Sequence, residues 1–137
     1  MGILCKNTPT VTVDSVVLSA VKSVNWTGLG RETVDVTSFD SSGWKQYVAG
    51  LKDAGSLTVE CEYIPDNEKQ KYAPGGALYG FYSDTAVSIS CAWPNAAGST
   101  TTWSCSGFLT GAEPTASVGE TLKIRFDYKL TGVPTLA

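Results

Sequence analysis

The sequence predicts a mainly β fold, a β-sandwich or small barrel with one short α-helix and a long extended loop. Three observations support this fold class. Apolar and polar residues alternate with a period of two in several segments, Val and Thr are frequent, and turn residues recur between these segments. One domain over residues 1–137 fits the length, and such a chain buries roughly two-thirds of its unfolded surface.

Three segments in the first half of the chain are expected to form strands. Residues 11–26 are rich in Val and Thr and predict one or two strands, whose register the sequence does not determine. Residues 33–37 alternate valines with polar side chains. Residues 57–63 place Leu, Val, Cys and Tyr on one face, opposite Thr and Glu on the other. These patterns are typical of strands that bury one face.

Residues 38–53 lack a sustained period and separate two of these strands. Loops of this length without secondary structure are uncommon in compact domains and are usually functional or disordered. Disordered segments are poor in aromatic residues, whereas this one contains Phe39, Trp44 and Tyr47. Either the loop packs these aromatics on its own domain or it offers them to a neighbouring molecule. The second interpretation is favoured, because aromatic side chains are frequent interface anchors.

One short helix is expected within residues 66–83. Polar residues after Pro65 would cap and charge a first helical turn. The Pro-Gly-Gly sequence at residues 74–76 interrupts the segment, and residues 77–82 would resume it.

A β-hairpin is expected between residues 87 and 109. Both of its strands place apolar side chains on one face, and the segment between them has the composition of a turn. A one-residue slip would move the whole apolar set to the other face, so the register is constrained. With Gly98 at the midpoint, the expected opposite pairs are Trp93 with Trp103 and Cys91 with Cys105.

The clearest strand covers residues 122–130. Its apolar residues share one face and its charged residues share the other, as expected for a strand that is half buried and half solvated. The apolar set is Leu122, Ile124, Phe126, Tyr128 and Leu130, and the charged set is Lys123, Arg125, Asp127 and Lys129.

The composition limits the classes of function. Charged residues make up 17% of the chain, below the usual quarter, and the net charge is −3. Stable binding of nucleic acid is therefore not expected, because it needs clustered Lys and Arg. Either much of the surface is buried against partners, or Ser and Thr hydroxyls solvate a β-domain. Without a run of about 18 apolar residues or a signal segment, assembly in a cytoplasm without membrane insertion is expected.

The residues needed for common catalytic chemistry are missing. The chain contains no histidine, which removes the Ser-His and Cys-His arrangements. Its 4 cysteines lack the Cys-x-x-Cys spacing of a zinc site and are expected to be reduced, buried hydrophobes. Glu60 and Glu62 share a strand face like a pair of catalytic carboxylates, but a solvated face is the favoured interpretation. The chain is therefore expected to be no enzyme and to hold no cofactor.

Short motifs in the central residues together resemble a known family. They are the Val-Asp-Val-Thr-Ser sequence at residues 34–38, the long loop, the Gly-Leu-Lys-Asp-Ala-Gly turn at residues 50–55, and the strand that follows at residues 56–63. The C-terminal strand and the Thr-Gly pair at residues 131–132 fit the same pattern. Over residues 11–133 the chain resembles the major tail tube proteins of siphoviruses, which are long-tailed bacteriophages.

The resemblance implies a structural virion protein with a β-sandwich fold, related to the inner tube of type VI secretion systems. Such subunits form hexameric rings that stack into a hollow tail tube around a tape-measure protein, and DNA later passes through the tube into the host. Tail tip and tail terminator proteins would be further partners, and the protein would reside in the virion tail.

In this family the long loop reaches the adjoining ring, which implies an interface role for that segment here. The residues concerned are Phe39, Asp40, Ser41, Ser42, Gly43, Trp44, Lys45, Gln46, Tyr47, Leu51 and Lys52.

Charged residues on the solvated strand faces are candidates for the wall of the lumen. Mixed charge with an acidic excess would let polyanionic DNA slide, whereas a basic lining would hold it. An ordinary outer surface is the alternative. The candidates are Asp35, Glu60, Glu62, Lys123, Arg125, Asp127 and Lys129. Other functions that remain open are a monomeric or low-order binding or decoration module, a tail terminator, and a type VI secretion tube subunit.

Overall fold

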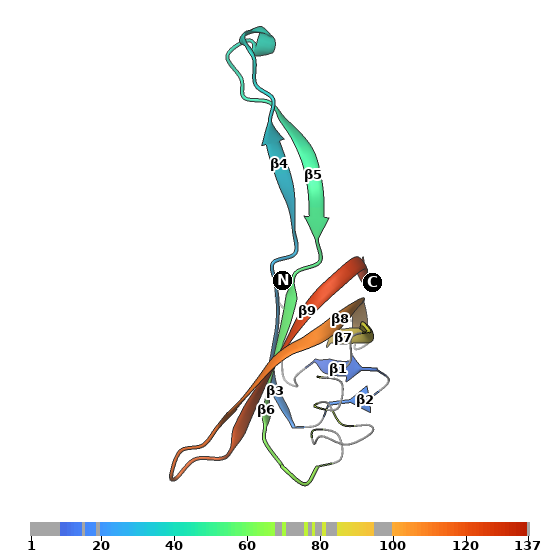
Figure 1. Cartoon of the computed structure of the whole chain (residues 1–137), viewed down its shortest axis with the longest axis vertical. Coiled ribbons are helices and arrows are strands. Elements are labelled where there is room, and N and C mark those ends of the chain that lie inside the picture. The colour runs from blue at the N-terminus through green and yellow to red at the C-terminus, as the bar shows by residue number, and fades with distance from the viewer. Residues whose placement is uncertain are drawn as a thin grey trace.

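Strands dominate the fold (Figure 1). The computed structural model describes residues 9–14, 16–18, 20–67, 70, 76, 78, 81, 85–94 and 100–136. The strands are β1 (Thr10–Val13), β2 (Val16–Val17), β3 (Val21–Thr27), β4 (Gly30–Asp35), β5 (Tyr47–Asp53), β6 (Ser56–Glu62), β7 (Val87–Pro94), β8 (Thr100–Thr115) and β9 (Lys123–Leu136). A short 3-10 helix, η1 (Phe39–Ser41), lies between β4 and β5.

Seven of the strands form one antiparallel sheet in the order β2-β1-β7-β8-β9-β6-β3. The sheet curls into a half-barrel. Its two longest strands, β8 and β9, pair with register shifts between Ser104 and Ser106 and between Leu109 and Gly111. Such bulges bend a strand and increase its twist, which suits a curled sheet. The mainly β prediction is confirmed, and the curled form is closer to the expected barrel than to a sandwich.

The buried core lies on one face of this sheet. Both segments with the clearest alternation are strands, β6 and β9, and they pair with each other so that Leu57 lies opposite Tyr128 and Val59 opposite Phe126. All of these side chains are fully or almost fully buried. Leu122 departs from its expected place, because it precedes β9 and is 42% exposed. The core also includes Val11, Val13, Cys61, Ile89, Cys91, Cys105, Leu109, Ile124 and Leu130.

The expected hairpin between residues 87 and 109 forms from β7 and β8, but its register was wrong by two residues. Cys91 lies opposite Trp103 instead of the expected Cys105. A shift of two residues keeps every side chain on its expected face, so alternation alone does not distinguish the two registers. Trp93 still contacts Trp103 edge to face, with ring centroids 6.1 Å apart. The actual partners of the other expected residues are Ile89 for Cys105 and Thr101 for Trp93.

The cysteines that the structure describes are buried and not joined in disulfides. Burial raises the pKa of the Cys61 thiol to about 11 and that of the Cys91 thiol to about 12. At neutral pH both are therefore protonated, weakly nucleophilic side chains that pack like small hydrophobes. This agrees with the role expected for them in the core.

The helix expected within residues 66–83 falls largely outside the described residues. At its start, Asn67 donates its backbone N–H to the Ile64 carbonyl, which forms a turn. The buried Gln70 side chain closes this turn onto the end of β6. Its Oε1 accepts the Ile64 N–H at 2.8 Å, and its Nε2 donates to the Glu62 carbonyl at 2.8 Å.

Candidate assembly arm and charged sheet face

A two-stranded hairpin projects away from the half-barrel (Figure 1). It consists of β4, η1 and β5, and we call residues 30–53 the arm. The prediction of an irregular loop over residues 38–53 holds for residues 38–46, which contain only η1, but was wrong for residues 47–53, which form β5 and pair with β4. Every residue of β4 and β5 is exposed. Apolar and polar residues alternate along a strand that buries one face. Both faces of the arm meet solvent, so β5 carries no such pattern.

The root of the arm is tightly fixed to the sheet. Gly55 has a φ of 89°, and a Cβ placed on it would lie 2.1 Å from the Thr27 carbonyl oxygen. Only glycine allows the two chain passages to approach so closely. The indole Nε1 of Trp26 donates to the Ala54 carbonyl at 2.9 Å, and the Leu130 N–H donates to the Gly55 carbonyl at 3.1 Å. These contacts fix the direction in which the arm leaves the body.

Asp53 completes the root from the end of β5. Its Oδ1 accepts the Gly55 N–H at 2.9 Å and lies 3.4 Å from Lys129 Nζ. The Gly55 hydrogen bond and the Lys129 ammonium lower the pKa of the Asp53 carboxyl. The charged form of Asp53 therefore favours the observed turn.

The tip of the arm is organised by its own hydrogen bonds. Thr37 Oγ1 accepts the Gln46 N–H at 2.8 Å, and the Val36 N–H donates to the Gln46 carbonyl at 2.9 Å. Asp35 Oδ1 accepts the Thr37 N–H at 2.8 Å, and hydrogen bonds from Thr37 lower the pKa of Asp35. Asp35 is thus part of the tip, and the structure does not bring it together with the other lumen candidates.

The predicted interface residues all lie on the arm. Phe39 is 107% exposed and Trp44 is 79% exposed. The structure therefore excludes packing of these aromatics on their own domain, one of the two alternatives that the sequence left open. The predicted residues follow the arm in order, with Phe39, Asp40 and Ser41 in η1, Ser42 and Gly43 at positive φ, Trp44, Lys45 and Gln46 on the return, and Tyr47, Leu51 and Lys52 in β5.

The arm exposes several large apolar side chains to solvent. Two-stranded hairpins are marginally stable in water, and contiguous exposed apolar patches mark interaction sites. The sequence predicted the aromatics and Leu51 as part of this surface but did not predict Val34, Val36 and Val48. The exposed apolar side chains of the arm are Val34, Phe39, Trp44, Tyr47, Val48 and Leu51, with Val36 beyond the end of β4.

The remaining lumen candidates lie together on the sheet face opposite the core, which we call the charged face. They come from β6 and β9, and the register pairs opposite charges directly: Glu60 with Arg125 and Glu62 with Lys123. Asp127 accepts a hydrogen bond from Thr58 Oγ1 at 3.1 Å, and Lys129 reaches Asp53. The sequence correctly predicted that these residues share a solvated face.

Two further charged residues, which were not among the predicted lumen candidates, extend this face. Lys22 of β3 forms an ion pair with Glu62 at 2.9 Å, and Glu113 of β8 forms one with Arg125 at 2.9 Å. Arg125 also lies 3.4 Å from Asp127. The long alternating pattern of β9 could have indicated Glu113. A strand of that length needs a neighbouring strand that continues past Leu109, and Glu113 lies in that continuation. The charged face thus intersperses cations and carboxylates rather than segregating them.

Other kinds of site are not indicated in the part of the chain that the structure describes. No cluster of His, Cys, Asp and Glu within it is arranged to hold a metal ion. None of its helices is long and apolar enough to cross a membrane. Glu60 and Glu62, considered above as a catalytic pair, are each engaged by β3, through the Ser23 hydroxyl and the Lys22 ammonium respectively.

A half-barrel with a projecting hairpin defines a class of fold that solved chains of tubular particles share. In a gene transfer agent (GTA), a chain of the native virion has a TM-score of 0.74 at 15% identity, covering 94% of this chain and 95% of that one. A chain in the tail of the empty GTA particle, determined by helical refinement with C6 symmetry, has a TM-score of 0.66 at 16% identity, covering 88% and 84%.

Two further particles contain similar chains. A chain of the PVC sheath-tube complex, an extracellular contractile injection system in its extended state, has a TM-score of 0.68 at 14% identity, covering 95% of this chain and 89% of that one. A chain of the SPP1 tail tube has a TM-score of 0.53 at 11% identity, covering 94% and 75%. No protein-family model and no curated protein matches the sequence. The chain therefore has the fold of tail tube proteins, as the resemblance implied.

Proposed function

We propose that this chain is the structural subunit of a phage-type tail tube, in which six copies form a ring and rings stack into a hollow tube. The fold supports the tube role, and the C6 symmetry of the similar GTA tail supports rings of six. The subunit acts by assembly and has no catalytic step.

The exposed arm is the observation that carries this proposal. Its aromatic tip and its apolar strands lie outside the core of their own chain. A surface of this kind gains stability when another molecule covers it, since burial contributes about 25 cal/mol per Å² of apolar area. In a tube each arm is covered by a copy in the same ring or in the adjoining one.

Ring formation would also cover the edges of the described sheet. These edges are β2 and β3, and an unpaired strand edge invites association with other chains. A closed ring places a neighbouring subunit beside each edge. The contact between stacked rings is head to tail, so it propagates into a filament instead of closing.

The charged face would line the lumen. Alternating carboxylates and cations neutralise one another locally, as the Arg125 ion pairs with Glu113 and Asp127 illustrate. Such a wall offers DNA phosphates no continuous basic surface, so DNA passes without stable binding. Before ejection the lumen would hold a tape-measure protein, and a tail tip and a tail terminator would close the two ends. The tube would assemble in the host cytoplasm and remain in the virion tail.

Electron microscopy of the purified, concentrated protein tests the function. Negatively stained samples are expected to contain hollow tubes, with six-fold rings in end views. Tubes without any other phage protein would show that the arm and the sheet suffice for assembly. Uniform small particles at the highest attainable concentration would contradict the proposal and favour a monomeric binding or decoration module.

The lumen assignment predicts that a basic wall retains DNA. Tubes of Glu60→Lys/Glu62→Lys are expected to retain short duplex DNA at about 50 mM salt and release it at about 500 mM, because counterion release makes phosphate binding salt-dependent. Co-sedimentation of labelled DNA with tubes measures this. Asp14→Lys/Asp66→Lys makes the same charge change on exposed turns outside the charged face. Asp14 adjoins β1, which β7, β8 and β9 separate from β6, and Asp66 follows the end of β6. Tubes of this variant are expected to retain none. Equal retention by both variants would place Glu60 and Glu62 on the outside.

A tube subunit of a contractile injection system is the second candidate. The similarity to the PVC sheath-tube complex favours it as directly as the GTA chains favour a phage-type tail. Particles purified through a tagged copy of this chain distinguish the two. Heads filled with DNA identify a phage-type tail, and sheathed particles without heads identify an injection system.

A further inference from the structure

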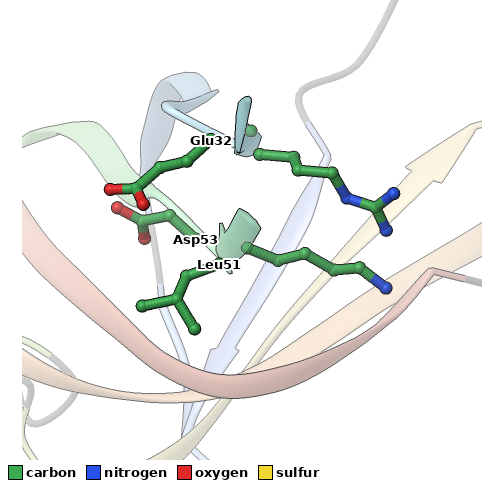
Figure 2. A pocket seen from close by; sticks show the side chains of 6 residues that line it. Glu32, Leu51 and Asp53 are labelled. Carbon is green, nitrogen blue, oxygen red and sulfur yellow. The ribbon is translucent and has the colours of Figure 1, made fainter. Parts of the chain in front are cut away.

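The base of the arm presents two sides of opposite charge. A pocket of about 340 Å³ at this base is lined by residues 30–32 and 51–53, and on one side of it the Glu32, Leu51 and Asp53 side chains extend in the same direction (Figure 2). Leu51 is 78% exposed, so an apolar side chain protrudes beside two carboxylates. Asp53 is partly neutralised by Lys129, which leaves Glu32 as the main charge of this side. We call these three residues the acidic knob.

The other side of the same two strands is basic. Arg31 of β4 lies directly opposite Lys52 of β5, and directly opposite residues in an antiparallel pair share a face. Successive residues of a strand alternate between faces, so Arg31 and Lys52 point away from the acidic knob. Opposite charges are thus separated across the thickness of one hairpin.

An apolar groove of about 730 Å³ adjoins the basic side. It lies between the base of the arm and the end of β9, and Arg31 and Lys52 line it whereas Glu32 and Leu51 do not. Asp53 also lines the groove, at the root where it binds Gly55 and Lys129. Val133 in this groove is 92% exposed, and the other apolar lining residues are Leu29, Pro134 and Leu136.

We propose that the groove receives the acidic knob of a second copy of this chain. Leu51 enters the apolar groove, and Glu32 meets Arg31 and Lys52 at its rim. The occupant is a second copy because the two surfaces are complementary: Leu51 and Glu32 lie on one side of the hairpin, and the apolar groove with Arg31 and Lys52 lies on the other. The contact is heterologous, so it repeats from copy to copy. It rests on the proposed function and identifies which surfaces of the arm meet in the tube.

A charge-exchange experiment tests the pairing. Glu32→Lys makes the knob basic, and Arg31→Glu/Lys52→Glu makes the groove rim acidic, so that each variant carries like charges on both sides. Each alone is expected to raise the critical concentration for tube growth at least tenfold. An equimolar mixture is expected to assemble near the wild-type concentration, because every knob then faces a groove of opposite charge when the variants alternate. Asp66→Lys, a charge reversal on an exposed turn outside the arm and the groove, is the control and is expected to assemble normally.

The outcomes separate this inference from the proposed function. If the wild type forms tubes and each charge variant alone also assembles normally, the pairing is overturned and the tube role stays intact. Failure of the mixture to recover would also overturn the pairing. A wild-type chain that does not self-associate would overturn both. Thermal unfolding of each variant verifies that the exchanged side chains, which are exposed, leave the fold unchanged.

Photo-cross-linking identifies the occupant of the groove independently of charge. A benzophenone amino acid replaces Val133 in a heavy-isotope copy, which is mixed with unlabelled chain before assembly. Cross-linking to the unlabelled tryptic peptide of residues 46–52, which contains Leu51, supports the proposal. Cross-linking to residues 1–6 of the same heavy copy would show that the chain's own N-terminus fills the groove, and would overturn it. Tubes without any cross-link to residues 46–52 would overturn it as well.

Discussion

Replacing Phe39 and Trp44 together with alanine is expected to abolish tube growth and leave the free energy of unfolding nearly unchanged. Both rings are exposed at the tip of the arm and therefore add little to the stability of the isolated subunit. Buried at an interface, each contributes about 2–3 kcal/mol. Losing both weakens a contact by roughly a thousandfold or more. Sedimentation across a concentration series measures assembly, and chemical denaturation measures stability.

Val118→Ala is the control for this double variant. Val118 is also fully exposed and apolar, but it lies in the loop between β8 and β9. We expect it to change neither stability nor tube growth. Normal tube growth by Phe39→Ala/Trp44→Ala would contradict the interface role of the tip. Loss of stability by more than about 1.5 kcal/mol, well above the usual effect of a surface change, would show that the aromatics support their own fold.

Gly55→Ala is expected to have the largest effect on stability of any single substitution at the root of the arm. The added Cβ would lie 2.1 Å from the Thr27 carbonyl oxygen and 2.8 Å from both the Gly28 carbonyl carbon and the Leu29 nitrogen. All three atoms belong to the backbone, so the two chain passages must separate. With the additional strain of an alanine at a φ of 89°, the expected loss is about 3–5 kcal/mol.

Gly43→Ala separates the steric effect from the conformational one. Gly43 has a similar φ of 83°, but no atom lies within 4 Å of a Cβ at that position. Its substitution is expected to cost only about 1–2 kcal/mol. Urea denaturation of both variants measures the difference. Equal losses would mean that backbone conformation alone, and not the close approach at the root, explains the need for glycine.

The sequence predicted the body of the fold because burial leaves a pattern there. In β6 and β9 one face is buried and the other is solvated, so alternation located both the core and the charged face. The β7–β8 register could not be obtained in this way, because registers that differ by two residues bury the same side chains. Lys22 was missed because it occupies a register irregularity in β3.

The arm shows what such a pattern cannot reveal. A strand that is exposed on both faces need not alternate, so β5, unlike β4, was expected to be irregular although it pairs with β4 over most of its length. Its exposed aromatic residues still predict a surface for contact with other molecules. Asp35 was grouped with the lumen candidates because its own strand alternates, but β4 had already left the sheet to which the others belong.

The unsupported arm has a consequence for how fast a tube of this kind starts. In the proposed tube, two free subunits would offer each other only one arm contact, whereas the growing end of a tube would offer an incoming subunit several at once. Spontaneous initiation is then slow and elongation fast, so growth shows a lag that preformed fragments remove. A cell that supplies one starting platform per particle would thereby obtain one tube per platform, with little protein lost to stray filaments.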